Sequence, residues 1–130
     1  MHTDAERVVL EFLDAWPRGN IEELMSFFAP DAVYHNIPVP PVRGAAAIRE
    51  AFLGFARLMR SIEIETLHVA AAGDVVFTER IDRFRSDTVA LDLPVAGVFE
   101  VRDGAIVAHR DYFDYQTWFR ATGISLDPTG

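Results

Sequence analysis

Cysteine and lysine are both absent from this sequence of 130 residues, and all 12 basic side chains are arginines. Without cysteine, the chain has no disulfide, no thiolate nucleophile, no iron–sulfur cluster and no zinc finger. Without lysine, it has no residue for Schiff-base chemistry and no lysine of a phosphate-binding loop. Any chemistry must therefore come from other side chains.

Positive charge is also scarce, because 20 acidic residues against 12 arginines give a formal net charge of −8. This balance argues against general nucleic-acid binding, which needs a basic surface to replace counterions. No apolar run approaches the ~18 residues of a membrane span, and the acids spread over residues 1–20 are unlike a signal peptide. We therefore expect no nucleic-acid partner, no membrane partner and a cytoplasmic location.

The composition is that of a globular protein, with 50% hydrophobic residues, 25% charged residues and 10 phenylalanines. A chain of 130 residues is long enough for one domain with one core. No internal repeat, low-complexity tract or linker divides it, and the proline-rich stretch 38–41 is short enough to be a rigid loop. We therefore expect a single domain over residues 1–130.

Helical signals occupy much of the first half of the sequence. A capping box at Thr3–Glu6, followed by apolar residues at helical spacing, predicts a first helix that a proline and a glycine end. Asn20 is expected to cap a short second helix. A strand is expected over residues 32–37, and a third helix with an apolar stripe over residues 45–60.

The second half has the alternation and turn signals of strands. We expect strands over residues 62–71, 75–85, 89–101 and 105–115. Pro94 and Gly97 predict a bend or a bulge in the third of these strands. Helices followed by a mainly antiparallel sheet indicate an α+β fold, with the helices packed on one face of a curved sheet. Such a sheet can close over its helices as a cone with a ligand pocket inside.

Polar side chains share strand faces at three places. Alternation puts Arg80 and Asp82 on one face, ~6.6 Å apart along the strand, so they can touch or share a partner. Tyr34 and Asn36 share one face of the first strand, and Asp111 lies on one face of the last. Taken singly, these fragments are typical of a solvated ion pair, an edge-strand hydrogen bond and a surface acid.

Histidine offers little support for a metal centre. His35, His68 and His109 lack the short H-x-H or H-x-x-x-H spacing of common ligand pairs. We therefore expect no metal ion and no cofactor.

Three motifs, taken in order, resemble those of the limonene-1,2-epoxide hydrolase family, a branch of the NTF2-like and SnoaL-like folds. They are YHNIPVPP at residues 34–41, TERID at 78–82 and RDYFD at 110–114. The likeness runs over most of the chain, from about Val8 to Trp118. The resemblance implies an NTF2-like cone with a curved mixed, mainly antiparallel sheet, an internal pocket and a homodimer. It also implies hydrolysis of a small-molecule epoxide without a cofactor.

The family's site carries over to five residues of this sequence. The resemblance implies that Asp111 is the base for a water that Tyr34 and Asn36 hold. It further implies that Asp82 donates a proton to the epoxide oxygen, and that Arg80 lies between the two carboxylates. This division suits epoxide opening, which needs a nucleophile deprotonated and an alkoxide protonated as it forms.

The substrate is expected to be an apolar or terpenoid-like epoxide, because the candidate pocket walls are apolar. The wall candidates are Phe55, Met59, Phe84, Leu93, Val95, Phe113 and Trp118. Two departures from the family bear on the identity of the substrate. The hairpin of residues 86–90 is short, and the polar His109 stands beside Asp111 where an aromatic residue is expected.

Three other functions remain open on the sequence. An epoxide-opening cyclase would use the same two acids with a substrate hydroxyl in place of water, whereas Tyr34 and Asn36 favour water. A ketosteroid-isomerase-like enzyme would share the cone, but an arginine between two aspartates tends to hold both acids ionised, which does not suit its proton shuttle. A non-catalytic ligand-binding or dimerisation module predicts the loss of pocket polar residues, and none is missing.

Overall fold

A computed structural model covers all 130 residues and has the expected capping box at the start of helix α1 (Asp4–Ala15). The Thr3 hydroxyl accepts a hydrogen bond from the Glu6 backbone N–H at 3.1 Å. The Glu6 carboxylate in turn accepts one from the Thr3 N–H at 2.9 Å. A short 3₁₀ turn, η1 (Trp16–Arg18), leads into α2 (Ile21–Met25). The helical start of the chain is therefore as predicted.

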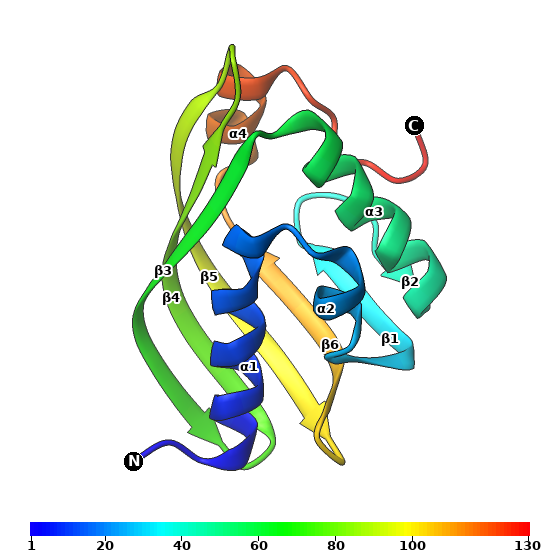
Figure 1. The fold of residues 1–130 in the computed structure, drawn as a ribbon, viewed down its shortest axis with the longest axis vertical. Helices are drawn as coiled ribbons and strands as arrows, with labels where there is room; N and C mark the ends of the chain where they lie inside the picture. The colour runs from blue at the N-terminus through cyan, green and yellow to red at the C-terminus, as the bar shows by residue number, and fades with distance from the viewer.

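One sheet of six strands forms the rest of the scaffold, in the order β2-β1-β6-β5-β4-β3. The strands are β1 (Phe28–Asn36), β2 (Val42–Arg43), β3 (Ser61–Ala72), β4 (Val75–Arg85), β5 (Ala90–Arg102) and β6 (Ala105–Tyr112). All neighbouring pairs are antiparallel except β1 and β6, which are parallel. The sheet is therefore mixed and mainly antiparallel, as expected, and Figure 1 shows it curving around α1.

Two further helices complete the fold. Helix α3 (Ala45–Leu58) buries Ile48 and Phe52 and packs against β1, and α4 (Tyr115–Thr122) follows β6 and packs against β5. In Figure 1 the C-terminal segment runs from α4 back towards α3. None of these helices combines the length and the apolar character that a membrane crossing requires.

The core is centred on Phe12 of α1, which is completely buried. Its ring contacts five rings of phenylalanine and tryptophan at centroid distances of 5.1–6.2 Å. These rings belong to Trp16, Phe27, Phe28, Phe52 and Phe99. Burial of one such side chain stabilises the fold by about 1.5–3 kcal/mol. The aromatic core thereby attaches α1 and α3 to the concave face of the sheet.

The prediction for the end of the sheet is wrong. The last strand stops at Tyr112 instead of residue 115, and residues 115–122 form α4, which the sequence pattern did not predict. Asp114 caps this helix, because its carboxylate accepts hydrogen bonds from the Gln116 N–H at 3.3 Å and the Thr117 hydroxyl at 2.6 Å. The strand-like alternation therefore ends where a side-chain cap offers the backbone a helical start.

Pro94 and Gly97 predicted a bend or a bulge in β5, but no register shift lies at either residue. Strands β4 and β5 pair without a register shift over their whole length. A shift does occur in β5, between Glu100 and Val101, but against β6. Gly97 lies opposite Thr78 in β4 and opposite Asp111 in β6. The glycine therefore occupies a regular position in the middle of the sheet.

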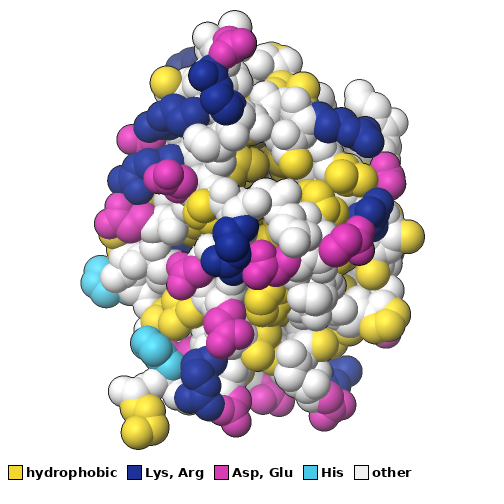
Figure 2. Space-filling view, viewed as in Figure 1, with side chains coloured by type: hydrophobic (Ala, Val, Ile, Leu, Met, Phe, Trp, Pro, Cys, Tyr) yellow, Lys and Arg dark blue, Asp and Glu magenta, His cyan; other side chains and the backbone are white.

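The surface carries many of the charges as pairs. Figure 2 shows acidic and basic side chains alternating over one face of the molecule, with apolar side chains between them. Exposed pairs include Arg18 with Glu23 and Arg83 with Glu65, each at 2.9 Å. Such pairs contribute little stability, with a median of about 0–1 kcal/mol.

Candidate active site

The register of the sheet aligns the polar positions of four strands. Asn36 in β1 lies opposite Asp111 in β6, which lies opposite Gly97 in β5. Gly97 in turn lies opposite Thr78 in β4. Arg80 follows Thr78 at the next position on the same face, since successive side chains of a strand point to opposite faces. Residues far apart in the sequence thereby meet on the concave face.

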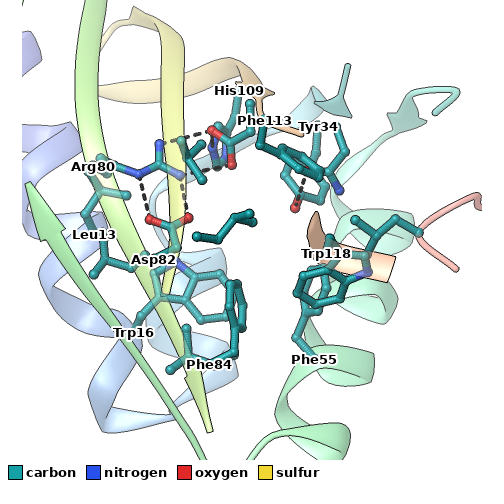
Figure 3. Close-up of a pocket in the computed structure, with 17 residues that line it drawn as sticks. Leu13, Trp16, Tyr34, Phe55, Arg80, Asp82, Phe84, His109, Phe113 and Trp118 are labelled. Atoms are coloured by element: carbon teal, nitrogen blue, oxygen red, sulfur yellow. Dashed lines mark hydrogen bonds and ion pairs between the residues drawn. The ribbon is translucent and has the colours of Figure 1, made fainter. Parts of the chain in front are cut away.

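Arg80 is the centre of this group and is only 1% exposed. Its guanidinium donates to Asp82 from Nε at 3.1 Å and from Nη2 at 2.8 Å. It donates to Asp111 from Nη1 at 3.0 Å and from Nη2 at 3.1 Å. Nη1 also donates to the Thr78 hydroxyl at 3.3 Å. All five N–H groups therefore have acceptors, and Figure 3 shows the guanidinium plane between two carboxylates.

Gly97 is required because the guanidinium passes directly over it. A Cβ atom at this position would lie 2.2 Å from Arg80 Nη1, 2.8 Å from Asp111 Oδ1 and 2.9 Å from Thr78 Oγ1. These separations are far below van der Waals contact. The glycine therefore marks a close approach, which is the other common reason for glycine within a strand.

Tyr34 and Asn36 form a second polar group, and both line the same hollow as Arg80 and its two aspartates. Figure 3 shows Tyr34 on the other side of this hollow from Arg80 and Asp82. The Tyr34 hydroxyl donates to Asn36 Oδ1 at 3.2 Å, and both side chains are buried. The parallel pairing of β1 with β6 holds the two groups together, since the Ile37 N–H donates to the Asp111 carbonyl oxygen at 2.9 Å. The amide NH₂ of Asn36 remains available to a molecule in the hollow.

His109 is a third polar side chain at the same place, and it is only 3% exposed. Its Nε2 lies 2.9 Å from Asp111 Oδ1, and its ring stacks on Phe99 with a centroid distance of 4.2 Å. The other ring nitrogen, Nδ1, is buried without a hydrogen-bond partner. The sequence pattern placed His109 on the face of Asp111 but did not indicate this contact.

Apolar side chains surround the polar groups and line a hollow; the empty space in and around it, open solvent at its mouth included, is about 530 Å³. Six of the seven expected wall residues line it: Phe55, Phe84, Leu93, Val95, Phe113 and Trp118. The seventh, Met59, is buried just beyond the C-terminal end of α3 and lines a separate depression instead. Met59 comes after the last residue of α3, so the helical spacing that predicted it on the same face as Phe55 does not apply to it.

Several wall residues were not predicted from the sequence. They are Leu13, Trp16, Ile62, Ile64 and Leu126. The alternation of β3 contained a signal for Ile62 and Ile64, which share one face. Leu126 reaches the hollow because the segment after α4 is tied back: the Trp118 indole N–H donates to the Ile124 carbonyl at 2.7 Å. No local pattern in the sequence encodes that return.

Burial and hydrogen bonding move the pKa values of the two aspartates in opposite directions. Burial raises the pKa of Asp82 above its ordinary value, although Arg80 opposes this change. Burial also acts to raise the pKa of Asp111, but the electrostatic effects of Arg80 and His109 and the hydrogen bonds from both side chains outweigh it, so that pKa is lowered. Burial raises the pKa of Tyr34, whose hydroxyl therefore stays neutral. Two carboxyls with separated pKa values suit an acid and a base.

The side chains of the chain do not form a metal-binding cluster. No group of three or more histidine, aspartate or glutamate side chains is arranged to hold a metal ion. The carboxylates of the hollow are instead bonded to Arg80 and His109.

Comparison with known proteins gives a consistent family. Residues 3–123 match the family model described as limonene-1,2-epoxide hydrolase catalytic domain. Epoxide hydrolase EphG of Mycobacterium tuberculosis is 33% identical over 115 residues, which are 84% of this chain and 72% of that protein. The solved structure of an M. tuberculosis LEH-like epoxide hydrolase superposes with a TM-score of 0.79 at 30% identity. That match covers 92% of this chain and 89% of the other.

A more distant structure supports the fold alone. It is a putative SnoaL-like polyketide cyclase from Shewanella putrefaciens, with a TM-score of 0.81 at 14% identity. The match covers 95% of this chain and 88% of that one. The expected NTF2-like and SnoaL-like architecture is thereby confirmed.

Proposed function

Because this chain belongs to the limonene-1,2-epoxide hydrolase family and is thus an epoxide hydrolase, we propose that it opens an apolar epoxide with water in one step to give a vicinal diol. The observation that carries the proposal is the Asp82–Arg80–Asp111 arrangement, which faces Tyr34 and Asn36 across an apolar hollow. One side of the hollow thus has an acid and a base, and the other has groups suited to holding water.

Asp111 is the base for the attacking water. Its Oδ1 accepts from Arg80 and His109, whereas its Oδ2 accepts only from Arg80, so Oδ2 has the freer lone pair. A water in the hollow donates one hydrogen to Oδ2 and the other to the Tyr34 oxygen, and it accepts from the Asn36 NH₂. The remaining lone pair of that water is then directed at an epoxide carbon.

Asp82 is the acid. Burial raises the pKa of Asp82, whereas the pKa of Asp111 is lowered, so a single proton on the pair belongs to Asp82. As the C–O bond breaks, its electron pair passes to the epoxide oxygen, which takes the Asp82 proton. The water proton passes to Asp111 at the same time. One proton must then return from Asp111 to Asp82, and Arg80 is bonded to both carboxyls throughout.

The walls favour an apolar or terpenoid-sized substrate. Apart from Arg80 and its two aspartates, no arginine, aspartate or glutamate lines the hollow. The Trp118 ring meets the rings of Phe84 and Phe55 edge-to-face, with centroid distances of 5.0 and 6.1 Å. Such walls offer contact area to a hydrocarbon and no partner for a charged metabolite.

The function is tested with a panel of small apolar epoxides and chromatographic detection of diols. Formation of diol from any member is the expected result, and a cyclic ether from a hydroxy-epoxide without diol would favour the cyclase reaction instead. Failure of the whole panel, with the protein folded, would count against the proposal.

A single turnover in ¹⁸O-water tests the one-step mechanism. If Asp111 is a base, the label enters the diol in the first turnover. If Asp111 attacks carbon and forms an ester, the first diol is unlabelled and the label enters the carboxylate. Unlabelled diol would therefore refute the role given to Asp111. Asp111→Asn is inactive under both mechanisms, so this substitution does not separate them.

A further inference from the structure

We infer that His109 is a positioning residue that determines which of the two buried aspartates is the base. The inference rests on the proposed function, and it adds a residue to the base side of that site. It begins from a near-symmetry: Arg80 donates two hydrogen bonds to each carboxylate, at 2.8–3.1 Å. The hydrogen bonds from Arg80 therefore do not by themselves determine which of the two aspartates carries the shared proton.

The surroundings of His109 favour the neutral imidazole. Its ring stacks on Phe99, meets Phe12 edge-to-face at 5.7 Å and tilts against Tyr34 at 5.1 Å. Nε2 lies 2.9 Å from Asp111 Oδ1, whereas Nδ1 is buried and has no partner. A protonated imidazole would bury a charged N–H at Nδ1 without an acceptor, which costs more than burying a lone pair. His109 is therefore neutral, with its hydrogen on Nε2.

The Nε2 hydrogen then requires an unprotonated oxygen at Asp111 Oδ1. His109 donates to that oxygen and to no atom of Asp82, so it stabilises the ionised form of Asp111 only. The charged or titratable groups that face Asp111 are Arg80 and Asp82 from β4, Tyr34 from β1 and His109 from β6. Of these, His109 is the neutral donor that distinguishes one acid from the other, and the proton remains on Asp82.

The same contact also fixes the orientation of the base. Oδ1 is held by His109 on one side and Arg80 Nη1 on the other, at 2.9 and 3.0 Å. Rotation of the carboxylate would break both bonds. Oδ2 is therefore kept towards the hollow, where the water is to be deprotonated.

A matched pair of variants tests this role. His109→Phe keeps a ring among the aromatic side chains but removes the donor, whereas His109→Gln offers an amide N–H near the position of Nε2. We expect Asp111 to titrate about one to two pH units higher in His109→Phe, as one hydrogen bond to a charged group is lost. In His109→Gln, the amide N–H should replace most of the lost hydrogen bond, so Asp111 should titrate close to its wild-type pH. The acid limb of kcat/KM should move in parallel.

The titration is followed by ¹³C NMR of labelled aspartate, which needs no substrate. An unchanged Asp111 titration in His109→Phe would overturn the inference. So would ¹⁵N NMR of the wild-type protein showing His109 protonated, or with its hydrogen on Nδ1, and this measurement does not depend on any variant folding. If Asp111 shifts as expected but the wild type hydrolyses no epoxide, the proposed function fails and the effect of His109 on Asp111 stands.

Discussion

At the scale of single residues, Arg80 holds together the two carboxyls of the site. It is 1% exposed, and its five N–H groups are all bonded to Asp82, Asp111 and Thr78. Lysine could not replace it, because an ammonium has no planar fork to bind two carboxylates at once. The side chain therefore serves both the chemistry and the stability of the site, and the two effects are separable by measurement.

We expect Arg80→Ala to lose diol formation and to lower the free energy of unfolding by about 3–5 kcal/mol, because it leaves two buried acids without a counter-charge. Urea denaturation and the diol assay measure the two effects. Arg83→Ala is the matched control, since Arg83 lies on the other face of β4 in an exposed pair with Glu65. A folded Arg80→Ala variant with most of its activity would contradict the role of the arginine.

Asp82→Asn should slow turnover by about 10²–10⁴-fold, because an amide does not deliver a proton to the opening oxygen. The measurement is kcat on an epoxide without an aryl substituent to activate it. Asp92→Asn on β5 serves as the control, since Asp92 is exposed and pairs with surface arginines. A rate near that of the wild type would remove Asp82 from the mechanism.

The pH dependence follows from the opposite pKa shifts of the two acids. The proposed mechanism needs Asp111 ionised, so we expect activity to fall as the pH drops through the lowered pKa of Asp111. The mechanism also needs Asp82 protonated, so we expect activity to fall as the pH rises through the raised pKa of Asp82. The expected profile of kcat/KM is a bell whose basic limb lies above the ordinary range of a carboxyl. A rate that keeps rising through the alkaline range would contradict this assignment.

At the scale of elements, the sequence correctly predicted those features that depend only on neighbouring residues. The capping box at Thr3–Glu6 and the Asn20 cap of α2 each depend on a few neighbouring residues, and both were predicted. Helix α4 was missed because the aromatic residues at its start continue the strand-like pattern. Its local signals are Asp114 at the N-terminal end and Gly123 at the C-terminal end. Gly97 was misread because the group that requires it, the Arg80 guanidinium, belongs to another strand.

The candidate site was likewise predicted in part. The alternation of side chains along strands predicted that Arg80 shares a face with Asp82. It made the same prediction for Tyr34 and Asn36, and the structure has both pairs on the concave face. The proximity of Asp111 to both pairs depends on the order and register of the strands, which the family resemblance supplied and local patterns did not. The bond from His109 to Asp111 likewise depends on side-chain packing in three dimensions.

Gly97→Ala tests the close packing of β5 against the site. Its Cβ would meet Arg80 Nη1 at 2.2 Å, and that side chain is buried and fully bonded, so it has little freedom to move aside. We expect activity to fall at least tenfold and the free energy of unfolding to fall by about 1–3 kcal/mol. Both are measured by the diol assay and by urea denaturation.

Gly54→Ala is the matched control for this substitution. Gly54 lies within α3, and a Cβ there meets no atom within 4 Å. Alanine in a helix interior is favoured over glycine by roughly 0.5–1 kcal/mol, so this variant should be slightly more stable than the wild type. If Gly97→Ala were as active and as stable as Gly54→Ala, the Arg80 guanidinium would have room to move away from β5.

At the scale of the whole molecule, a charged group at the centre of a 130-residue protein has a cost. Arg80, Asp82 and Asp111 are taken out of water, and their mutual attraction returns only part of the lost hydration. The surrounding aromatic core must supply the difference. The arrangement is therefore expected to serve activity at the expense of stability, as is common at active sites.

The test is a variant in which the whole charged group is made apolar: Arg80→Met, Asp82→Leu and Asp111→Leu, with His109→Phe. The histidine is included because its Nε2 hydrogen would otherwise lose its acceptor and remain buried. The leucine side chains are larger than those of aspartate and would extend into the hollow that these residues line. Replacing a complete buried ion group is neutral or stabilising by about 1–4 kcal/mol, in contrast to removal of one partner. We therefore expect an inactive protein whose urea midpoint is at or above that of the wild type, while Arg80→Ala lies well below it. A combined variant as unstable as Arg80→Ala would mean that the charged group itself stabilises the fold.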